Sequence, residues 1–402
     1  MAVTIEDTPK DYAPVYNKME YLLSSTNSGN TDFSYLVDIY INGSGTKTVR
    51  LRIPIRPSDS YGLVDIHRVL EATLTSDVGS TKMTAASADT SNSVLTYIVK
   101  FGEEYDVAGT LTQFPDLTVD STRYAINASV EKQEFIDWDF LADYDMTSSA
   151  DKFITNMPDN HNVSINGHGW LYFKEKTAVT YYEIETFDSA GTTISTFRLD
   201  PTATSGTIQY IPSAPETLNG IGAGYFLAGA QPIITSSVAS YTIFLYGGGV
   251  ISETRTFVIK EPCKFNANTL IFQNKLGMFD DFTFYNGDSS THQIERKQMK
   301  VNIDPVSGTS LSYSMQEREK VQYYTKQTET IKLMSDWITE EEDAWLLELI
   351  ESPEIYLQDG DTLIAVSNIK ATSHTKKKEA RDKLFKLEVE LELGYDNYRQ
   401  RG

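Results

Sequence analysis

The segment LFKLEVELEL, near the end of the chain, constrains the fold more than any other. Its apolar and charged residues alternate: Phe385, Leu387, Val389, Leu391 and Leu393 against Lys386, Glu388, Glu390 and Glu392. Successive side chains of a β-strand point to opposite faces of a sheet, so this pattern predicts a strand with one buried face and one solvated face. The chain therefore needs an antiparallel sheet with a core on one side.

A second alternation predicts a β-hairpin near the N-terminus. In DFSYLVDIYINGSGTKTVRLRIPI, two alternating stretches flank residues 42–45, Asn-Gly-Ser-Gly, which favour a turn. Pro54 and Pro57 place the second strand at a sheet edge, because proline has no N–H to donate to a neighbouring strand. A short helix with Asp65 as its N-cap should follow in VDIHRVLEATL, and then a polar loop and strands in VLTYIVKFGEEYD and RYAINASVEKQEF.

Short strands recur through the middle of the chain. They are expected near residues 170, 183, 196 and 209 and within 241–259, with turns at Asp188 and Gly247. Strands at a spacing of about 8–15 residues, separated by glycine-rich turns, are typical of a β-sandwich.

The C-terminal region combines strands with one helix. Thr339 and Glu342 have the spacing of a capping box, in which the threonine hydroxyl accepts from the N3 amide and the glutamate reaches back. The helix should end at Ser352-Pro353. Its apolar face consists of Trp345, Leu346, Leu349 and Ile350.

These features predict a mainly β protein of several β-sandwiches with a C-terminal α+β domain, an antiparallel sheet plus one capped helix. The expected domains are an extended N-terminal arm (1–17), a β-rich domain with a short helix (18–135), a β-sandwich (136–261) and the α+β domain (262–402). In an assembly, an arm of this kind often lies on a neighbouring subunit.

The charge balance of the chain limits the classes of function that it can have. Lys and Arg number 35 against 56 Asp and Glu, for a formal charge of -21. This argues against a general nucleic-acid binder, because phosphate contacts need clustered Lys and Arg. Cys263 is the one cysteine, so an intrachain disulfide is impossible and a small buried apolar role is expected. Neither a secretion signal nor a membrane span is expected, since Pro232 and many Gly, Ser and Thr residues interrupt the apolar stretch 224–251.

No segment carries the pattern of a known catalytic or cofactor site. DWDFLADYD lacks the residue order of an EF-hand loop, and the glycines of LNGIGAGYF lack the strand–turn–helix context of a dinucleotide site. His161 and His168 allow a shared metal, but no Cys or carboxylate lies at ligand spacing beside them, so loop polarity is favoured. We expect no catalytic residue, no cofactor and no metal ion.

The segment KLGMFDDFTFYNGDSSTHQIERKQMK concentrates acids around one histidine, and we interpret it as a hairpin. Its core-facing positions are Met278, Phe282 and Phe284. Residues 286–288, Asn-Gly-Asp, supply the turn. Asp280 and Asp281 either cap backbone amides at its entry or pair with Arg296 and Lys297 on the return strand. Replacement of Asp281 should then alter stability or assembly.

A basic run near the C-terminus interrupts this acidic chain. It contains Lys376, Lys377 and Lys378. A lysine-rich hairpin tip that keeps an edge strand from pairing wrongly is the favoured interpretation. An electrostatic contact with an acidic partner or a phosphate remains open.

Three segments together resemble structural proteins of tailed bacteriophage virions, in the tail, baseplate or neck. They are PVYNKMEYLLSS with FSYLVDIYINGSG and GLVDIHRVL; FQNKLGMFDDFTF; and the run from WITEEEDAWLLELIESPEIYL to LFKLEVELELGYDNYRQR. In the third, a capped helix on an antiparallel sheet is similar to tail-tube and distal-tail folds. The resemblance covers both ends of the chain and is weak between residues 80 and 240.

The resemblance implies a non-enzymatic subunit that assembles in the host cytoplasm into a ring or tube of the virion and contacts other tail or neck proteins. The candidate assembly contacts are Tyr12, Tyr16, Phe279, Asp281, Lys376, Lys377 and Lys378. The alternative is a carbohydrate-binding or host-adhesion protein built on the central sandwich. A glycosidase ranks last, because no motif selects a pair of acids.

Overall fold

The computed structural model describes residues 3–90, 92–174, 179–201, 208–262, 266–369 and 385–399. The chain divides into two compact units: Met1–Lys260 with Phe272–Asp281, and Glu261–Ile271 with Phe282–Gly402. Strands hold 46% of the described residues and helices 9%, so the predicted mainly β class is confirmed. The domain boundaries drawn from the sequence stay predictions.

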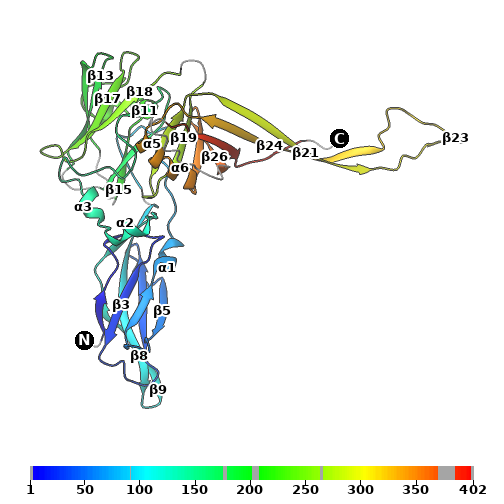
Figure 1. The fold of residues 1–402 in the computed structure, drawn as a ribbon. Helices are drawn as coiled ribbons and strands as arrows, with labels where there is room; N and C mark the ends of the chain where they lie inside the picture. The colour runs from blue at the N-terminus through cyan, green and yellow to red at the C-terminus, as the bar shows by residue number, and fades with distance from the viewer. Residues whose placement is uncertain are drawn as a thin grey trace. The chain divides into compact units, whose positions relative to one another are not determined.

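The first unit begins with two sheets that share a core (Figure 1). Their strand orders are β1-β3-β6 and β2-β10-β8-β4-β5, with β9 paired to β8. The strands are β1 Val3–Asp7, β2 Tyr12–Pro14, β3 Glu20–Ser25, β4 Ser34–Ile41, β5 Val49–Pro54, β6 Gly62–Asp65, β8 Val94–Val107, β9 Thr110–Val119 and β10 Arg123–Ile126. The predicted hairpin of β4 and β5 is confirmed, with β5 at the sheet edge.

The N-terminal segment is part of these sheets. β1 pairs antiparallel with β3, and β2 pairs parallel with β10. Ala13 and Val15 are buried in the core of the unit. The segment expected to be an extended arm therefore lies on its own chain, because its apolar residues find a place in that core.

The predicted short helix is present, but Asp65 is not its N-cap. Helix α1 spans His67–Glu71, and its N-cap is Ile66 without a side-chain hydrogen bond. The Asp65 carboxylate instead accepts from the backbone amides of Met19 and His67, at 3.1 and 3.2 Å. Asp65 therefore joins the start of α1 to the segment before β3.

Beyond β10 the chain turns into two short helices rather than continuing as the expected strand. They are α2 Lys132–Ile136 and α3 Phe140–Tyr144. α3 packs beside β2: the ring of Phe140 stacks on that of Tyr12, with centroids 5.0 Å apart.

Two further sheets of the first unit form the predicted β-sandwich. Its sheets have the orders β11-β18-β17-β13-β14-β16 and β12-β15-β7. The elements are β7 Ala88–Asp89, β11 His161–Val163, β12 Trp170–Lys174, β13 Tyr181–Phe187, β14 Thr193–Leu199, β15 Ile208–Pro212, α4 Pro215–Asn219, the 3₁₀ helix η1 Ala223–Tyr225, β16 Phe226–Ala228, β17 Ser240–Tyr246 and β18 Arg255–Ile259. The hydroxyls of Tyr182 and Tyr241 join the two layers by donating to the carbonyls of Ala86 and Ser213.

The remaining large sheet has the order β20-β19-β25-β26-β27-β24-β21, with β28 beside β24. It belongs to the second unit except for the end of β19 and the start of β20, which fall within Phe272–Asp281 of the first unit. The elements are β19 Asn268–Gln273, β20 Phe279–Phe284, β21 Asp288–Lys300, β22 Val306–Ser307, β23 Ser310–Leu311, β24 Lys320–Met334, α5 Glu340–Trp345, α6 Leu347–Glu351, β25 Ile355–Asp359, β26 Thr362–Ile369, β27 Glu388–Leu393 and β28 Asn397–Tyr398. In β27, Val389, Leu391 and Leu393 are buried and alternate with more exposed glutamates, as the sequence predicted.

The capping box at the start of α5 is confirmed. The Thr339 hydroxyl accepts from the amide of Glu342 at 3.2 Å, and the Glu342 carboxylate accepts from the amide of Thr339 at 2.7 Å. Trp345, Leu346 and Leu349 are buried. The single helix that the sequence predicted is divided at Leu346 into α5 and α6, and α6 ends at Glu351, just before Ser352. The cap fixes where α5 begins.

The expected hairpin turn at residues 286–288 is wrong. β20 pairs with β19 before it, through a turn in which the amide of Asn274 donates to the carbonyl of Met278 at 2.7 Å. Gly277 supplies the positive φ of +86° that this turn requires. β20 and β21 lie at opposite ends of the strand order, so residues 286–288 connect the two ends. The core positions of β20, Phe282 and Phe284, are buried as predicted.

Candidate assembly surface

The acids singled out in the sequence lie inside the first unit. Asp281 contacts His161, with 3.3 Å between the carboxylate Oδ2 and the imidazole Nε2. The Thr155 hydroxyl donates to Asp280 at 2.8 Å. The expected pairing of these acids with Arg296 and Lys297 is therefore wrong.

A carboxylate beside a histidine has the groups of an acid–base pair, but this pair is sealed. The side chains of His161 and Asp281 are 2% and 5% exposed. The backbone of Gly169 also packs closely on Asp281, since a Cβ at that glycine would lie 2.5 Å from the carboxylate. The pair therefore joins two parts of the fold and does not face a substrate. Among the described residues, no group of three or more His, Cys, Asp and Glu is placed to hold a metal ion.

The other candidate contacts are divided between core and surface. Tyr12 is 7% exposed, and its ring stacks on that of Tyr124 with centroids 4.3 Å apart. Phe279 is fully buried. Burial removes Tyr12, Phe279 and Asp281 as surface contacts. Tyr16 is 52% exposed and stays a candidate. Lys376, Lys377 and Lys378 lie outside the described residues.

The structure reveals a different candidate surface. It is the long hairpin of residues 288–334 in the second unit (Figure 1). It consists of β21, β24 and the loop between them. β21 pairs with β24 from Asp288 opposite Leu333 to Lys300 opposite Lys320, with one register shift between Lys297 and Gln298. All 13 residues of β21 are exposed.

An antiparallel strand normally buries one of its two faces. β21 buries neither, and its outer edge has no partner strand in the described part of the chain. β24 pairs on its other side with β28 at residues 326–327 and with β27 at residues 330–334. The outer part of the hairpin is thus a two-stranded ribbon, and a ribbon of this kind is marginally stable without further contacts.

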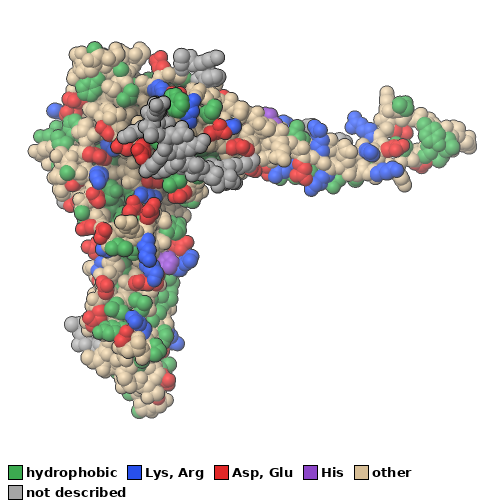
Figure 2. Space-filling view, in the orientation of Figure 1, with side chains coloured by type: hydrophobic (Ala, Val, Ile, Leu, Met, Phe, Trp, Pro, Cys, Tyr) green, Lys and Arg blue, Asp and Glu red, His purple; other side chains and the backbone are tan. Residues whose placement is uncertain are grey.

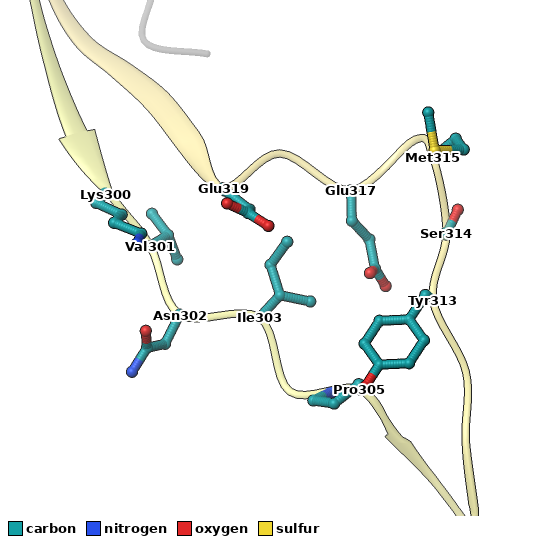
Figure 3. A pocket seen from close by; sticks show the side chains of 10 residues that line it. All are labelled: Lys300, Val301, Asn302, Ile303, Pro305, Tyr313, Ser314, Met315, Glu317 and Glu319. Carbon is teal, nitrogen blue, oxygen red and sulfur yellow. The ribbon is translucent and has the colours of Figure 1, made fainter.

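The end of the long hairpin is apolar. Val306 is 60% exposed, Leu311 65%, Tyr313 78% and Met315 102%. Beside them, the loop encloses a hollow of about 530 Å³. Figure 3 shows Ile303, Tyr313 and Glu317 pointing into it. Large apolar side chains exposed together at the end of a hairpin are typical of a surface that another molecule covers.

Behind this apolar end, one face of the ribbon is cationic. Arg296, Gln298 and Lys300 alternate along β21 and therefore share a face, and Lys320 lies directly opposite Lys300. Two like charges at opposed positions destabilise a sheet. Within the described chain, none of Arg296, Lys300 and Lys320 has a carboxylate at ion-pair distance. These three residues form what we call the cationic face.

The opposite face of the ribbon is neutralised. Lys297 pairs with Glu295 at 3.3 Å, and Lys326 pairs with Asp396 at 2.9 Å. Figure 2 shows Lys and Arg side chains along the hairpin and hydrophobic side chains at its end. The hairpin carries seven basic and six acidic residues within a chain of charge -21.

Sequence reasoning missed this surface. The signal was the segment HQIERKQMK, which has no apolar alternation and so marks a strand without a buried face. No helix of the described residues has the length and apolar character needed to cross a membrane.

Comparisons with known proteins give little further information. No protein-family model matches the chain, and no curated protein matches it. One solved structure with some similarity is the crystal structure of Dpr2 Ig1-Ig2 in complex with DIP-Theta Ig1-Ig3. It is 8% identical, the match covers 83% of this chain and 95% of that chain, and the TM-score is 0.18. A likeness this low supports no statement about function.

Proposed function

We propose that the chain is a non-enzymatic structural subunit of a tailed-phage virion, which assembles with copies of itself into a ring or tube of the tail, baseplate or neck. It acts by holding its neighbours in place, and other tail or neck proteins contact the assembly. Assembly takes place in the host cytoplasm.

The long hairpin carries this proposal. Its strand β21 is exposed along its whole length, and four large apolar side chains are exposed at its end. Keeping such a ribbon in an isolated monomer is unfavourable, whereas burial of its apolar end against a neighbour gains about 25 cal/mol per Å² of apolar surface. The segment resemblance to virion proteins supports the same role.

A variant with a shortened hairpin tests the proposal. Lys297 and Tyr324 face each other across the ribbon, so residues 298–323 can be replaced by Asn-Gly, which favours a tight hairpin turn. The residues of β24 that pair with β27 and β28 remain. The variant should fold, because the removed residues lie outside the sheet core, and it should stay monomeric.

The measurement is mass photometry and electron microscopy of the purified full chain and the variant. The full chain should form symmetric oligomers, and circular dichroism should show the same strand content per residue in both proteins. Oligomers that persist in the shortened variant would show that the hairpin is not needed for assembly. A full chain that stays monomeric at high concentration and hydrolyses or binds glycans would overturn the structural role.

A further inference from the structure

One segment of the first unit is complementary to the long hairpin. Residues 131–145, the α2–α3 segment, contain six acidic residues and one basic residue. Three of the acids pair with lysines: Glu134 with Lys275, Asp143 with Lys152 and Asp145 with Lys174. The other three, Glu131, Asp137 and Asp139, are exposed, and none has a cation at ion-pair distance in the described chain.

The α2–α3 segment also exposes apolar side chains. Ile136 is 64% exposed and Leu141 is 36% exposed. Trp138 and Leu141 line a hollow of about 380 Å³, together with residues 7–12 and Arg123. The α2–α3 segment thus combines exposed apolar side chains with carboxylates that have no cation at ion-pair distance among the described residues, and it is the counterpart of a hairpin that carries an apolar end and unpaired cations.

We propose that the long hairpin of one copy docks on the α2–α3 segment of a second copy. This proposal rests on the assembly role proposed above and names the two surfaces that perform it. The cationic face lies opposite Glu131, Asp137 and Asp139, and the apolar end packs on Ile136 and Leu141. Because the two surfaces differ, each subunit uses its hairpin on one neighbour and its α2–α3 segment on another. Such heterologous contacts produce a ring when they close and a filament when they do not.

A second copy of this chain is the occupant that the charges favour. Outside the long hairpin, the chain has far more acidic than basic residues, so copies repel each other unless the cationic face takes part. The long hairpin as a whole carries seven basic and six acidic residues, a balance that lacks the clustered Lys and Arg needed for phosphate contacts with a nucleic acid or an anionic membrane.

Charge reversal tests both surfaces. The first variant is Lys300→Glu with Lys320→Glu, and the second is Asp137→Lys with Asp139→Lys. Each should weaken self-association about 100-fold or more, because like charges then meet across the interface. The variant that carries all four changes should recover to within about tenfold of the unchanged chain, since the pairs are restored with opposite polarity. Arg68→Glu and Glu261→Lys are controls, exposed elsewhere and without a place in either surface.

Sedimentation velocity at about 50 mM and about 500 mM salt measures association, and it should weaken at the higher salt concentration. Thermal unfolding of every variant checks that the fold is intact. If the unchanged chain assembles and neither reversal weakens it, or the fourfold variant stays monomeric, the docking proposal fails while the structural function stands. An unchanged chain that never assembles defeats both proposals. The unchanged chain could instead associate only when polyphosphate or anionic vesicles are added, and lose this association in the Lys300→Glu, Lys320→Glu variant. That result would identify the anionic ligand, and not a second copy, as the occupant of the cationic face.

Discussion

The imidazole of His161 and the carboxylate of Asp281 lie 3.3 Å apart inside the first unit, although 120 residues separate them in the chain. Asp281→Ala removes the carboxylate and leaves His161 buried without that partner. We expect the free energy of unfolding to fall by about 1–3 kcal/mol, the usual cost of losing one side of a buried polar contact.

Urea unfolding followed by tryptophan fluorescence measures this change. Asp288→Ala is the control, because Asp288 is exposed at the start of β21 and should change the free energy by less than about 0.5 kcal/mol. Equal midpoints for Asp281→Ala and the unchanged chain would show that the pair contributes no stability.

Acid should weaken the first unit through Asp120. Burial raises the pKa of this carboxyl, but hydrogen bonds from Arg123 at 2.6 Å and Tyr21 at 2.8 Å outweigh burial, so its pKa in the folded chain is lowered. A group whose folded pKa lies below its unfolded value, about 3.9, stabilises the fold above that value. This stabilisation is lost as the pH falls through the folded pKa. Asp120→Asn should therefore destabilise the chain at pH 7, and its deficit should shrink below pH 4.

Urea unfolding from pH 7 to pH 3 tests this dependence. Asp116→Asn is a matched control, since Asp116 is 44% exposed and has a positive φ that asparagine tolerates. Its difference from the unchanged chain should be small at every pH. A deficit of Asp120→Asn that is the same at pH 7 and pH 3 would contradict the charge-based account.

Helix α5 of the second unit should depend on its capping box. Thr339→Ala removes the hydroxyl that accepts from the Glu342 amide, and we expect a loss of about 1 kcal/mol. Thr339→Ser should restore most of it, because serine keeps the hydroxyl. Differential scanning calorimetry measures both. Thr291→Ala, exposed on β21, controls for the loss of a threonine, and a Thr339→Ala loss no larger than that of the control would count against the cap.

Alanine substitution at two glycines with almost the same φ should distinguish the cost of backbone strain from the cost of steric crowding. Gly248 and Gly277 have φ of +84° and +86°. A Cβ at Gly248 meets nothing within 4 Å, whereas one at Gly277 lies 2.3 Å from the carbonyl oxygen of Asn127. Gly248→Ala should cost about 1 kcal/mol from φ alone. Gly277→Ala should cost at least about 2 kcal/mol more, because backbone cannot move aside as a side chain does. Equal losses in urea unfolding would contradict this difference.

The features that the sequence predicted well are local ones. The alternation in β27 and the capping box at Thr339 each depend on residues within a few positions of one another. The hairpin of β4 and β5 likewise needs one turn between two alternating stretches. The side-chain alternation of a strand and the hydrogen bonds of a helix cap involve residues close together in sequence. The local pattern is therefore sufficient to predict these elements.

The features that the sequence missed depend on distant partners or on competing turns. Residues 286–288 and residues 274–277 both have turn composition, and only the pairing of β20 with β19 decides between them. The partner of Asp281 lies in a different sheet, which no spacing rule reveals. The predicted arm failed for a similar reason, since Tyr12 is buried by Tyr124 and Phe140, more than 110 positions further on.

The division of the chain has a consequence for its synthesis on the ribosome. Phe272–Asp281 belongs to the first unit, where the Lys275 carbonyl accepts from the amide of Ser129 and Asp280 accepts from Thr155. The first unit therefore stays incomplete during translation until Asp281 has left the exit tunnel, after Glu261–Ile271 of the second unit has already emerged. A nascent chain that pauses near Lys260 exposes a first unit whose core still lacks Phe272–Asp281. Proteolysis near Lys260 likewise yields an N-terminal fragment without this segment.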